Sequence, residues 1–272
     1  MRGPEVRALC LAVGAFAAGA AGAADVADFA ATRPVPRIEY PQQRLIDITA
    51  HLDHAADLSA VRLLFVGDSI TDFFCMAANP WIPGKVGGRA VWDETFGPGH
   101  PQNLALNLGI SGDRTEWLLY RLLPKAAGGL GELDRADLNP QFIILMAGIN
   151  NTYAAETPLV DSVVAGVRAL VDALHAARPK ATVILESLLP GNEDWRNRDA
   201  LIPVNHRLIQ LAHSMPYSSY VEYLDLYPLF VDAAGHQRGE MFMDNLHPDE
   251  AGYRIWRDAL VSRLDGVRAA HR

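Results

Sequence analysis

Five short apolar segments of strand length alternate with amphipathic segments of helical length along most of the chain. The apolar segments span 61–67, 103–109, 142–148, 182–190 and 220–227. Segments with helical periodicity span 115–127, 159–177, 200–213 and 249–264. Strict alternation predicts βαβ units, which build a parallel sheet covered by helices on both faces. We therefore expect a single α/β domain with three α/β/α layers around a five-stranded parallel sheet.

The N-terminal residues differ in composition from the rest of the 272-residue chain. Residues 1–24 carry Arg2 and Arg7, then an Ala-rich apolar run and small residues, a pattern typical of a secretory signal peptide. The apolar run is short for the alternative, a membrane anchor. Residues 25–58 predict a proline-containing lead-in and a helix, and 59–267 the α/β domain. We expect a periplasmic or secreted protein with no stable membrane anchor once the signal is cleaved.

Charge and composition exclude several classes of function. A formal net charge of −8 makes nucleic acid an unfavourable partner. His51 and His54 lie three residues apart in the first predicted helix, but no further ligands complete a metal site. The chain has no Gly-Lys-Ser/Thr phosphate loop and no strand-linked dinucleotide fingerprint. The sequence therefore predicts neither a metal nor a cofactor.

Reactive residue types follow the predicted strands at the edge where ligands bind in open parallel sheets. The segments that leave these strands are Gly67-Asp68-Ser69 after the first, "LGISGDRT" with Gly109 at the second, "AGINN" with Asn150 after the third, and "MDNLHPDEAGY" with Asp244 and His247 after the fifth. We expect this hydroxyl, amide, carboxylate and imidazole to meet at one edge.

These residue types suit nucleophilic catalysis on an ester. A serine hydroxyl needs a base to accept its proton, and histidine is best matched to that task. We therefore predict Ser69 as nucleophile and His247 as base. Asp244 would hold the imidazole in the correct tautomer. Taken singly, each motif has an alternative: Gly-Asp-Ser is a common turn, and Asp244 with His247 could be half a metal site.

Ester attack also requires donors for the oxyanion that forms. The predicted donors are the backbone N–H groups of Ser69 and Gly109 and the side-chain amide of Asn150, although Asn150 could instead cap a following helix. A rival nucleophile elbow, Gly-x-Ser-x-Gly, fails at Ser111 because Asp113 replaces the last glycine.

The motifs "GDSITD", "NLGISGDRT", "GINN" and "DNLHP" resemble the four signature blocks of the SGNH (GDSL-type) hydrolases. That family comprises esterases and acyl-hydrolases with a flavodoxin-like fold. "VWDETFG", "GDRTEWLLYRL", "AGINN" and "SLLP" are most similar to the catalytic subunits of platelet-activating factor acetylhydrolase Ib and their bacterial relatives. The resemblance implies the same triad and oxyanion residues. Ser111 departs from that branch, which often has glycine there.

The expected activity is that of a serine esterase that removes short acyl groups, acetyl above all, from a carbohydrate or small ester. We expect the substrate to contact residues in the loops around the nucleophile: Asp68, Trp81, Arg114, Asn151 and Trp195. The tryptophans could stack on a sugar or simply pack. Alternative functions for the same site are those of a lysophospholipase or thioesterase, an acyltransferase, or an inactive carbohydrate-binding protein. The sequence is also compatible with a homodimer.

Overall fold

The computed structural model describes residues 28–38, 42–154 and 156–270, so the predicted signal peptide lies outside the described residues. The described strands form one five-stranded parallel sheet in the order β2-β1-β3-β4-β5. Their bounds are Leu63–Gly67 (β1), Ala105–Asn107 (β2), Phe142–Met146 (β3), Thr182–Glu186 (β4) and Val221–Leu224 (β5). Leu63 is paired with Ala105 on one side and Phe142 on the other. This is the flavodoxin-like order, which confirms the predicted fold class.

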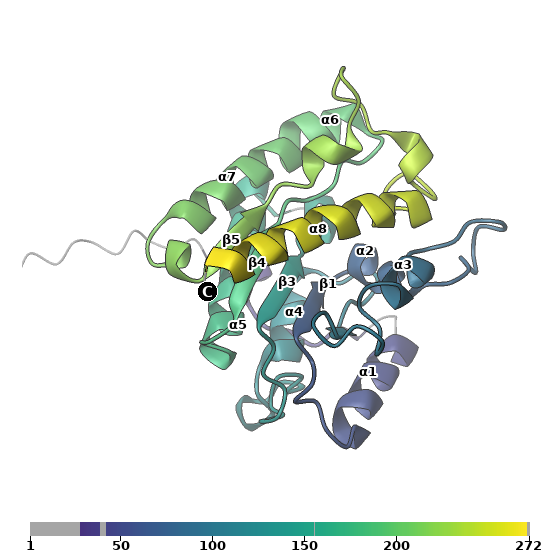
Figure 1. The fold of residues 1–272 in the computed structure, drawn as a ribbon. Helices are drawn as coiled ribbons and strands as arrows, with labels where there is room; N and C mark the ends of the chain where they lie inside the picture. The colour runs from purple at the N-terminus through teal and green to yellow at the C-terminus, as the bar shows by residue number, and fades with distance from the viewer. Residues whose placement is uncertain (1–27, 39–41, 155, 271–272) are drawn as a thin grey trace, which may run out of the picture.

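Helices cover both faces of the sheet (Figure 1). Helix α8 crosses one face and contacts α3, while α4, α5 and α7 pack together on the other. The helices are Gln42–His54 (α1), Ser69–Asp72 (α2), Arg89–Asp93 (α3), Thr115–Leu122 (α4), Leu159–Ala177 (α5), Asp194–Arg196 (α6), Ile202–His213 (α7) and Glu250–Ala270 (α8). Within the described ranges, no helix has the length and apolar character needed to span a bilayer.

The aromatic core supports the start of the chain's first βα unit. Phe65 of β1 contacts Trp92 and Phe96, with ring centroids 5.0 and 5.2 Å away. Phe74, just after α2, also packs edge-on against both of those rings. The Trp92 side chain is buried in this cluster. Because the cluster clamps both β1 and the segment after α2, it fixes the turn between them, where Ser69 lies.

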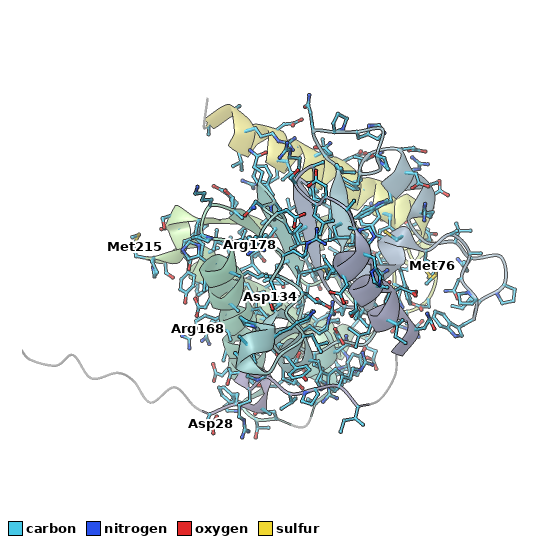
Figure 2. All side chains as sticks on the ribbon, turned by 90° about the horizontal axis from the view of Figure 1, so that it is seen from below. Asp28, Met76, Asp134, Arg168, Arg178 and Met215 are labelled. Carbon is cyan, nitrogen blue, oxygen red and sulfur yellow. The ribbon has the colours of Figure 1, made fainter. Side chains whose placement is uncertain are left out.

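The connection from 76 to 101 brings a surface loop to the last βα connection. Its first half projects from the body of the molecule, beyond Met76 (Figures 1 and 2). Asn79 donates from Nδ2 to Met243 Sδ at 2.9 Å, and Lys85 Nζ donates to the Phe242 carbonyl at 3.5 Å. These contacts tether the projecting loop beside Asp244, the residue after Met243.

Candidate active site

Ser69 is the first residue of α2, immediately after β1. The turn between them is tight because Gly67 has no side chain: a Cβ there would lie 2.1 Å from Thr71 Oγ1 and 2.4 Å from the Met146 carbonyl. Asp68 caps the helix, its Oδ1 accepting from the Ile70 N–H at 3.0 Å. Packing and capping therefore present Ser69 at the carboxyl edge of the sheet.

The structure brings Ser69, His247 and Asp244 into one chain of hydrogen bonds. His247 Nε2 lies 2.8 Å from Ser69 Oγ, and His247 Nδ1 lies 2.8 Å from Asp244 Oδ2. Ser69 is 178 residues from His247 in sequence, so only the fold joins them. One imidazole nitrogen thus faces the hydroxyl while the other faces the carboxylate, the arrangement that acyl transfer by a serine requires.

Asp244 is held in the ionised form. Its Oδ1 accepts from the backbone N–H groups of Leu246 and His247, at 2.8 and 2.7 Å. Partial burial by itself would raise the pKa of Asp244, but the hydrogen bonds from the His247 side chain and from these two N–H groups outweigh burial and lower it to about 2. The carboxylate is therefore charged, and able to orient an imidazole, at any pH near neutrality.

Asp68 was predicted to contact substrate, and its burial corrects that prediction. The residue is completely inaccessible to solvent; its Oδ1 serves as the cap of α2, and its Oδ2 has no hydrogen-bond partner among the described residues. Burial raises the pKa of Asp68 to about 7, although the Ile70 N–H and the nearby His247 oppose the rise. Asp68 therefore acts on Ser69 through the helix start and does not reach a bound ester.

Gly109 was predicted to supply an oxyanion donor, and its hydrogen bond contradicts this. The Gly109 N–H donates to Asn107 Oδ1 at 2.7 Å, a side chain two residues earlier. A Cβ at Gly109 would lie 2.4 Å from the Asp72 nitrogen. The position needs glycine because α2 packs directly against it, and its N–H is already in use.

Gly112, three residues later in the same loop, has the properties that Gly109 lacks. Its φ of +80° is in the region that favours glycine. Within the described residues its N–H donates to no acceptor. Next to it, the Asp113 carbonyl accepts from Asn150 Nδ2 at 2.9 Å. That bond uses one of the two amide N–H groups of Asn150 and leaves the other for a ligand. The sequence motif did not predict Gly112, because it contains two glycines and Gly109 comes first.

Two further residues predicted to bind substrate have other contacts. Asn151 is buried, and its side chain accepts from the Thr115 N–H at 3.0 Å and donates to Glu116 Oε2 at 2.8 Å. The prediction for Asn151 is therefore corrected: it joins α4 to the turn after β3. Arg114 lies 3.9 Å from Glu116 Oε1 and over the ring of Trp117 at 5.2 Å. A role for Arg114 in substrate binding stays a prediction.

Exposed aromatic side chains lie on the connections that follow β1, β3 and β4. Trp81, 60% exposed, packs on Phe73 at 5.8 Å between centroids, and Phe73 packs on the His247 ring at 4.8 Å. Trp195 is 53% exposed in the short helix α6, which follows β4. Tyr153, also exposed, ends the turn Asn150–Tyr153.

The guanidinium of Arg196 contacts the rings of both Tyr153 and Trp195. Its guanidinium carbon lies 3.7 Å from the centroid of Tyr153 and 4.7 Å from that of Trp195. Sequence reasoning missed Tyr153 and Arg196, since neither belongs to a motif. The available signal was proximity in sequence: Tyr153 lies three residues after Asn150, and Arg196 directly follows Trp195.

Within the described ranges, the His, Cys, Asp and Glu side chains form no group of three that could hold a metal ion.

Comparisons with known proteins show the family to which the chain belongs. A model described as the GDSL-like Lipase/Acylhydrolase family matches residues 65–255. The platelet-activating factor acetylhydrolase IB subunit alpha2 of Rattus norvegicus is 30% identical over 192 residues, 70% of each chain. A GDSL-like lipase from Bacteroides thetaiotaomicron has a similar structure, with a TM-score of 0.59 at 19% identity over 83% of this chain and 97% of that one. A carbohydrate esterase family 3 structure from Talaromyces cellulolyticus has a TM-score of 0.51 at 19% identity, covering 76% and 97%.

Proposed function

Because the chain belongs to the GDSL-like lipase/acylhydrolase family and is a carboxylic ester hydrolase, we propose that it removes acetyl groups from carbohydrate esters, with Ser69 as its nucleophile. The observation that carries this proposal is the unbroken contact from Ser69 Oγ through the His247 ring to Asp244, with 2.8 Å at each step. Such a relay has a direct use in acyl transfer.

The proposed reaction has two halves. In the first, His247 Nε2 takes the proton of Ser69 Oγ as the oxygen attacks the ester carbonyl, and then delivers that proton to the departing alcohol. The acyl group is left on Ser69. In the second half, His247 takes a proton from the water that attacks the acyl-enzyme, and returns it to Ser69 Oγ as the bond to the acyl group breaks and the acid is released. Throughout, Asp244 keeps the imidazole oriented and stabilises its charged form.

We assign the oxyanion to three donors: the backbone N–H groups of Ser69 and Gly112 and the side chain of Asn150. Ser69 heads α2, so its N–H lies among those without an intrahelical acceptor. The free Gly112 N–H replaces the donor first expected at Gly109, which is engaged by Asn107. Loss of one donor of this kind costs roughly a hundred- to a thousandfold in rate.

Two observations favour an acetylated carbohydrate as substrate. The curated relative is named an acetylhydrolase, which favours a short acyl group. In addition, the exposed large aromatic side chains of the described residues are Trp81, Tyr153 and Trp195, and all three lie on connections that follow the carboxyl ends of strands. Aromatic faces left exposed beside a nucleophile suit the apolar face of a sugar ring.

Export is part of the same proposal. The composition of residues 1–24 supports a cleaved signal, which would place the enzyme in the periplasm or outside the cell. N-terminal sequencing of the protein from the exported fraction should find a start just after Ala23 or Ala24. An N-terminus at Met1 in that fraction would contradict cleavage.

The nucleophile is tested by Ser69→Ala on an aryl acetate and on an acetylated oligosaccharide. Turnover of both should fall by about 10⁴-fold or more, since removing a triad serine disables the whole relay. Ser111→Ala is the control, because Ser111 is the rival serine of the sequence and, among the described residues, its hydroxyl makes no hydrogen bond to the triad. It should hydrolyse both esters at close to the wild-type rate. Full activity in Ser69→Ala would overturn the proposed mechanism.

A further inference from the structure

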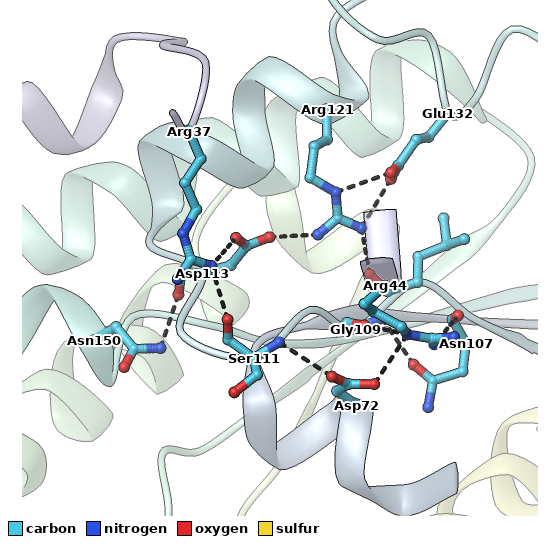
Figure 3. Close-up of polar contacts among 11 residues, drawn as sticks. Arg37, Arg44, Asp72, Asn107, Gly109, Ser111, Asp113, Arg121, Glu132 and Asn150 are labelled. Carbon is cyan, nitrogen blue, oxygen red and sulfur yellow. Dashed lines mark hydrogen bonds and ion pairs between the residues drawn. The ribbon is translucent and has the colours of Figure 1, made fainter. Parts of the chain in front are cut away.

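Three arginines from different elements converge on residues 107–113, the end of β2 and the loop that follows it (Figure 3). Arg37 comes from the lead-in, Arg44 from α1 and Arg121 from α4. Their guanidinium groups donate to backbone carbonyls of the loop. Arg37 reaches Ser111, Arg44 reaches Asn107 and Gly109, and Arg121 reaches Leu108. The loop that carries Gly112 is therefore held through its carbonyl oxygens.

Arg37 is fixed on several sides. Its Nη1 donates to the Ser111 carbonyl at 2.7 Å and to Asp113 Oδ1 at 3.0 Å, and its guanidinium lies over Trp117 at 4.6 Å. The other oxygen of Asp113 accepts from Arg121. The Arg37 side chain is 17% exposed. A charge-assisted bond in a site so little exposed holds its acceptor firmly.

The Ser111 carbonyl shares a peptide unit with the Gly112 N–H. This unit is planar and trans, so the N–H points away from the atom that binds the carbonyl. Arg37 therefore determines which way the Gly112 N–H points. The Ser111 N–H is also held, because it donates to Asp72 Oδ2 at 3.2 Å. Glycine tolerates many backbone conformations, so without such contacts the Ser111–Gly112 unit could rotate at little cost.

We propose that Arg37 is a positioning residue that aims the Gly112 N–H at the oxyanion of the reacting ester. The inference rests on the proposed function, in which Gly112 is a donor. The lead-in precedes the family-matched residues 65–255. The inference gives it a part in catalysis at a site whose nucleophile, Ser69, is more than thirty residues away in sequence.

Arg44 belongs to the same network as Arg37 but supports different backbone donors. The carbonyls that it binds, those of Asn107 and Gly109, share peptide units with the N–H groups of Leu108 and Ile110. Those two N–H groups donate to β1 carbonyls, at 2.8 and 3.2 Å. Arg44 therefore supports donors that the sheet already uses, whereas Arg37 supports a donor that is free.

The test compares Arg37→Met with Arg135→Met in steady-state hydrolysis of an aryl acetate. Arg135 is the matched control because it also donates to two backbone carbonyls, of Leu52 and Ala55, and pairs with Asp137, but on a loop away from the triad. Arg37→Met should lower kcat about ten- to a hundredfold with KM close to wild type, since an ill-aimed donor is lost mainly in the transition state. Arg135→Met should keep both constants.

A second readout separates donor geometry from general loss of structure. A trifluoromethyl ketone forms an adduct with the serine whose oxyanion uses the same donors, so its inhibition constant should rise in Arg37→Met by about the factor by which kcat falls. Arg37→Lys, which restores a donor to the Ser111 carbonyl, should fold like wild type and recover part of kcat.

Unchanged kcat in Arg37→Met and Arg37→Lys, or a fall in kcat with no change in ketone inhibition, would overturn the inference. Ser69→Ala distinguishes this failure from failure of the proposed function. If Ser69→Ala is inactive while Arg37→Met matches Arg135→Met, only the positioning role is wrong. If Ser69→Ala is fully active, the proposed function itself is wrong.

Discussion

At the scale of single residues, the site depends on which polar groups are already engaged. Asp68 and Asn151 have suitable chemistry and lie next to reactive residues, but both are buried, with contacts that support the backbone. Asp244 also holds two backbone N–H groups, yet it keeps its second oxygen for His247. The role of a residue therefore does not follow from its position in a motif. It depends on whether the side chain or backbone still has a hydrogen-bond donor or acceptor that is not engaged.

Asp244→Asn tests the orienting role. The asparagine can still accept the backbone N–H groups, but its amide cannot hold His247 in the required tautomer, so kcat should fall about 10⁴-fold, as for other triads. Asp249→Asn is the control, since Asp249 also accepts two backbone N–H groups, at 3.0 and 3.2 Å, in the same segment and touches no imidazole. Equal activities of the two variants in aryl acetate assays would refute the assignment.

Much of the site could be predicted from residue type and order. Ser69, Asn150, Asp244 and His247 follow strands whose carboxyl ends share an edge, so their proximity needed only the fold. The choice between Gly109 and Gly112 could not be predicted, because it depends on the Asn107 side chain folding back onto Gly109. That contact has no signature in the sequence.

At the scale of elements, local sequence signals set some boundaries well. Helix α5 begins and ends where expected, at Leu159 and Ala177, because Pro158 precedes it and Pro179 follows closely. The helix expected over 115–127 ends at Leu122, since Pro124 disfavours helical backbone in the residue before it. The short helices α2 and α3 were not predicted, because four or five residues are too few to show a period.

The strands are shorter than their apolar runs. The run 182–190 remains a strand only to Glu186. Beyond it, the Leu188 N–H and carbonyl are bound by the Asn205 side chain, at 2.8 and 2.9 Å, and not by a neighbouring strand. Tertiary hydrogen bonds thus turn the end of the run into the loop that leads to α6, where Trp195 lies.

The proposed role of the exposed aromatic side chains in sugar binding can be tested with Trp195→Ala. If the Trp195, Arg196 and Tyr153 stack binds a sugar, kcat/KM for an acetylated oligosaccharide should fall by about 2- to 10-fold, while hydrolysis of an aryl acetate stays unchanged. Met215→Ala, which removes a side chain 77% exposed on the connection before β5, is the control. Equal loss on both esters would indicate a structural defect and contradict a sugar-binding role.

At the scale of the whole molecule, the alternation of apolar and amphipathic segments was sufficient to predict the architecture. Parallel strands buried on both faces require apolar runs, and each crossover requires a helix, so five runs lead to the three-layer fold. The sequence predicted the lead-in and α1 but no contact between them and the site. Their arginines instead contact the loop beside the site, an interaction between charged groups and carbonyls that no apolar pattern reveals.

A buried carboxyl group links the sheet to α8 and makes stability depend on pH. Glu186 Oε1 accepts from Trp256 Nε1 at 2.6 Å, and Oε2 has no partner within the described structure. Burial raises the pKa of Glu186 to about 8, although the Trp256 bond opposes the rise. The folded protein then holds a proton that the unfolded chain releases at lower pH. Stability should therefore fall as pH rises through the window between the ordinary glutamate pKa and about 8.

Glu186→Gln removes this titration and keeps an acceptor for Trp256. The free energy of unfolding of the variant, relative to wild type, should therefore increase between about pH 5 and pH 9 in urea denaturation. Glu222→Gln, on β5 and paired with Arg263 at 3.6 Å, controls for the removal of a carboxylate. A difference for Glu186→Gln that does not change with pH would show that Glu186 is not protonated in the folded state.

The most direct measurement for the account as a whole is the site of covalent labelling by a fluorophosphonate, read by mass spectrometry of the intact protein and of its peptides. A relay of hydroxyl, imidazole and carboxylate predicts one adduct per chain, carried by Ser69, with hydrolytic activity lost in proportion to labelling. A chain that still hydrolyses esters while unlabelled, or that is inactivated by an adduct on any other residue, would contradict the assignment of Ser69 as the nucleophile.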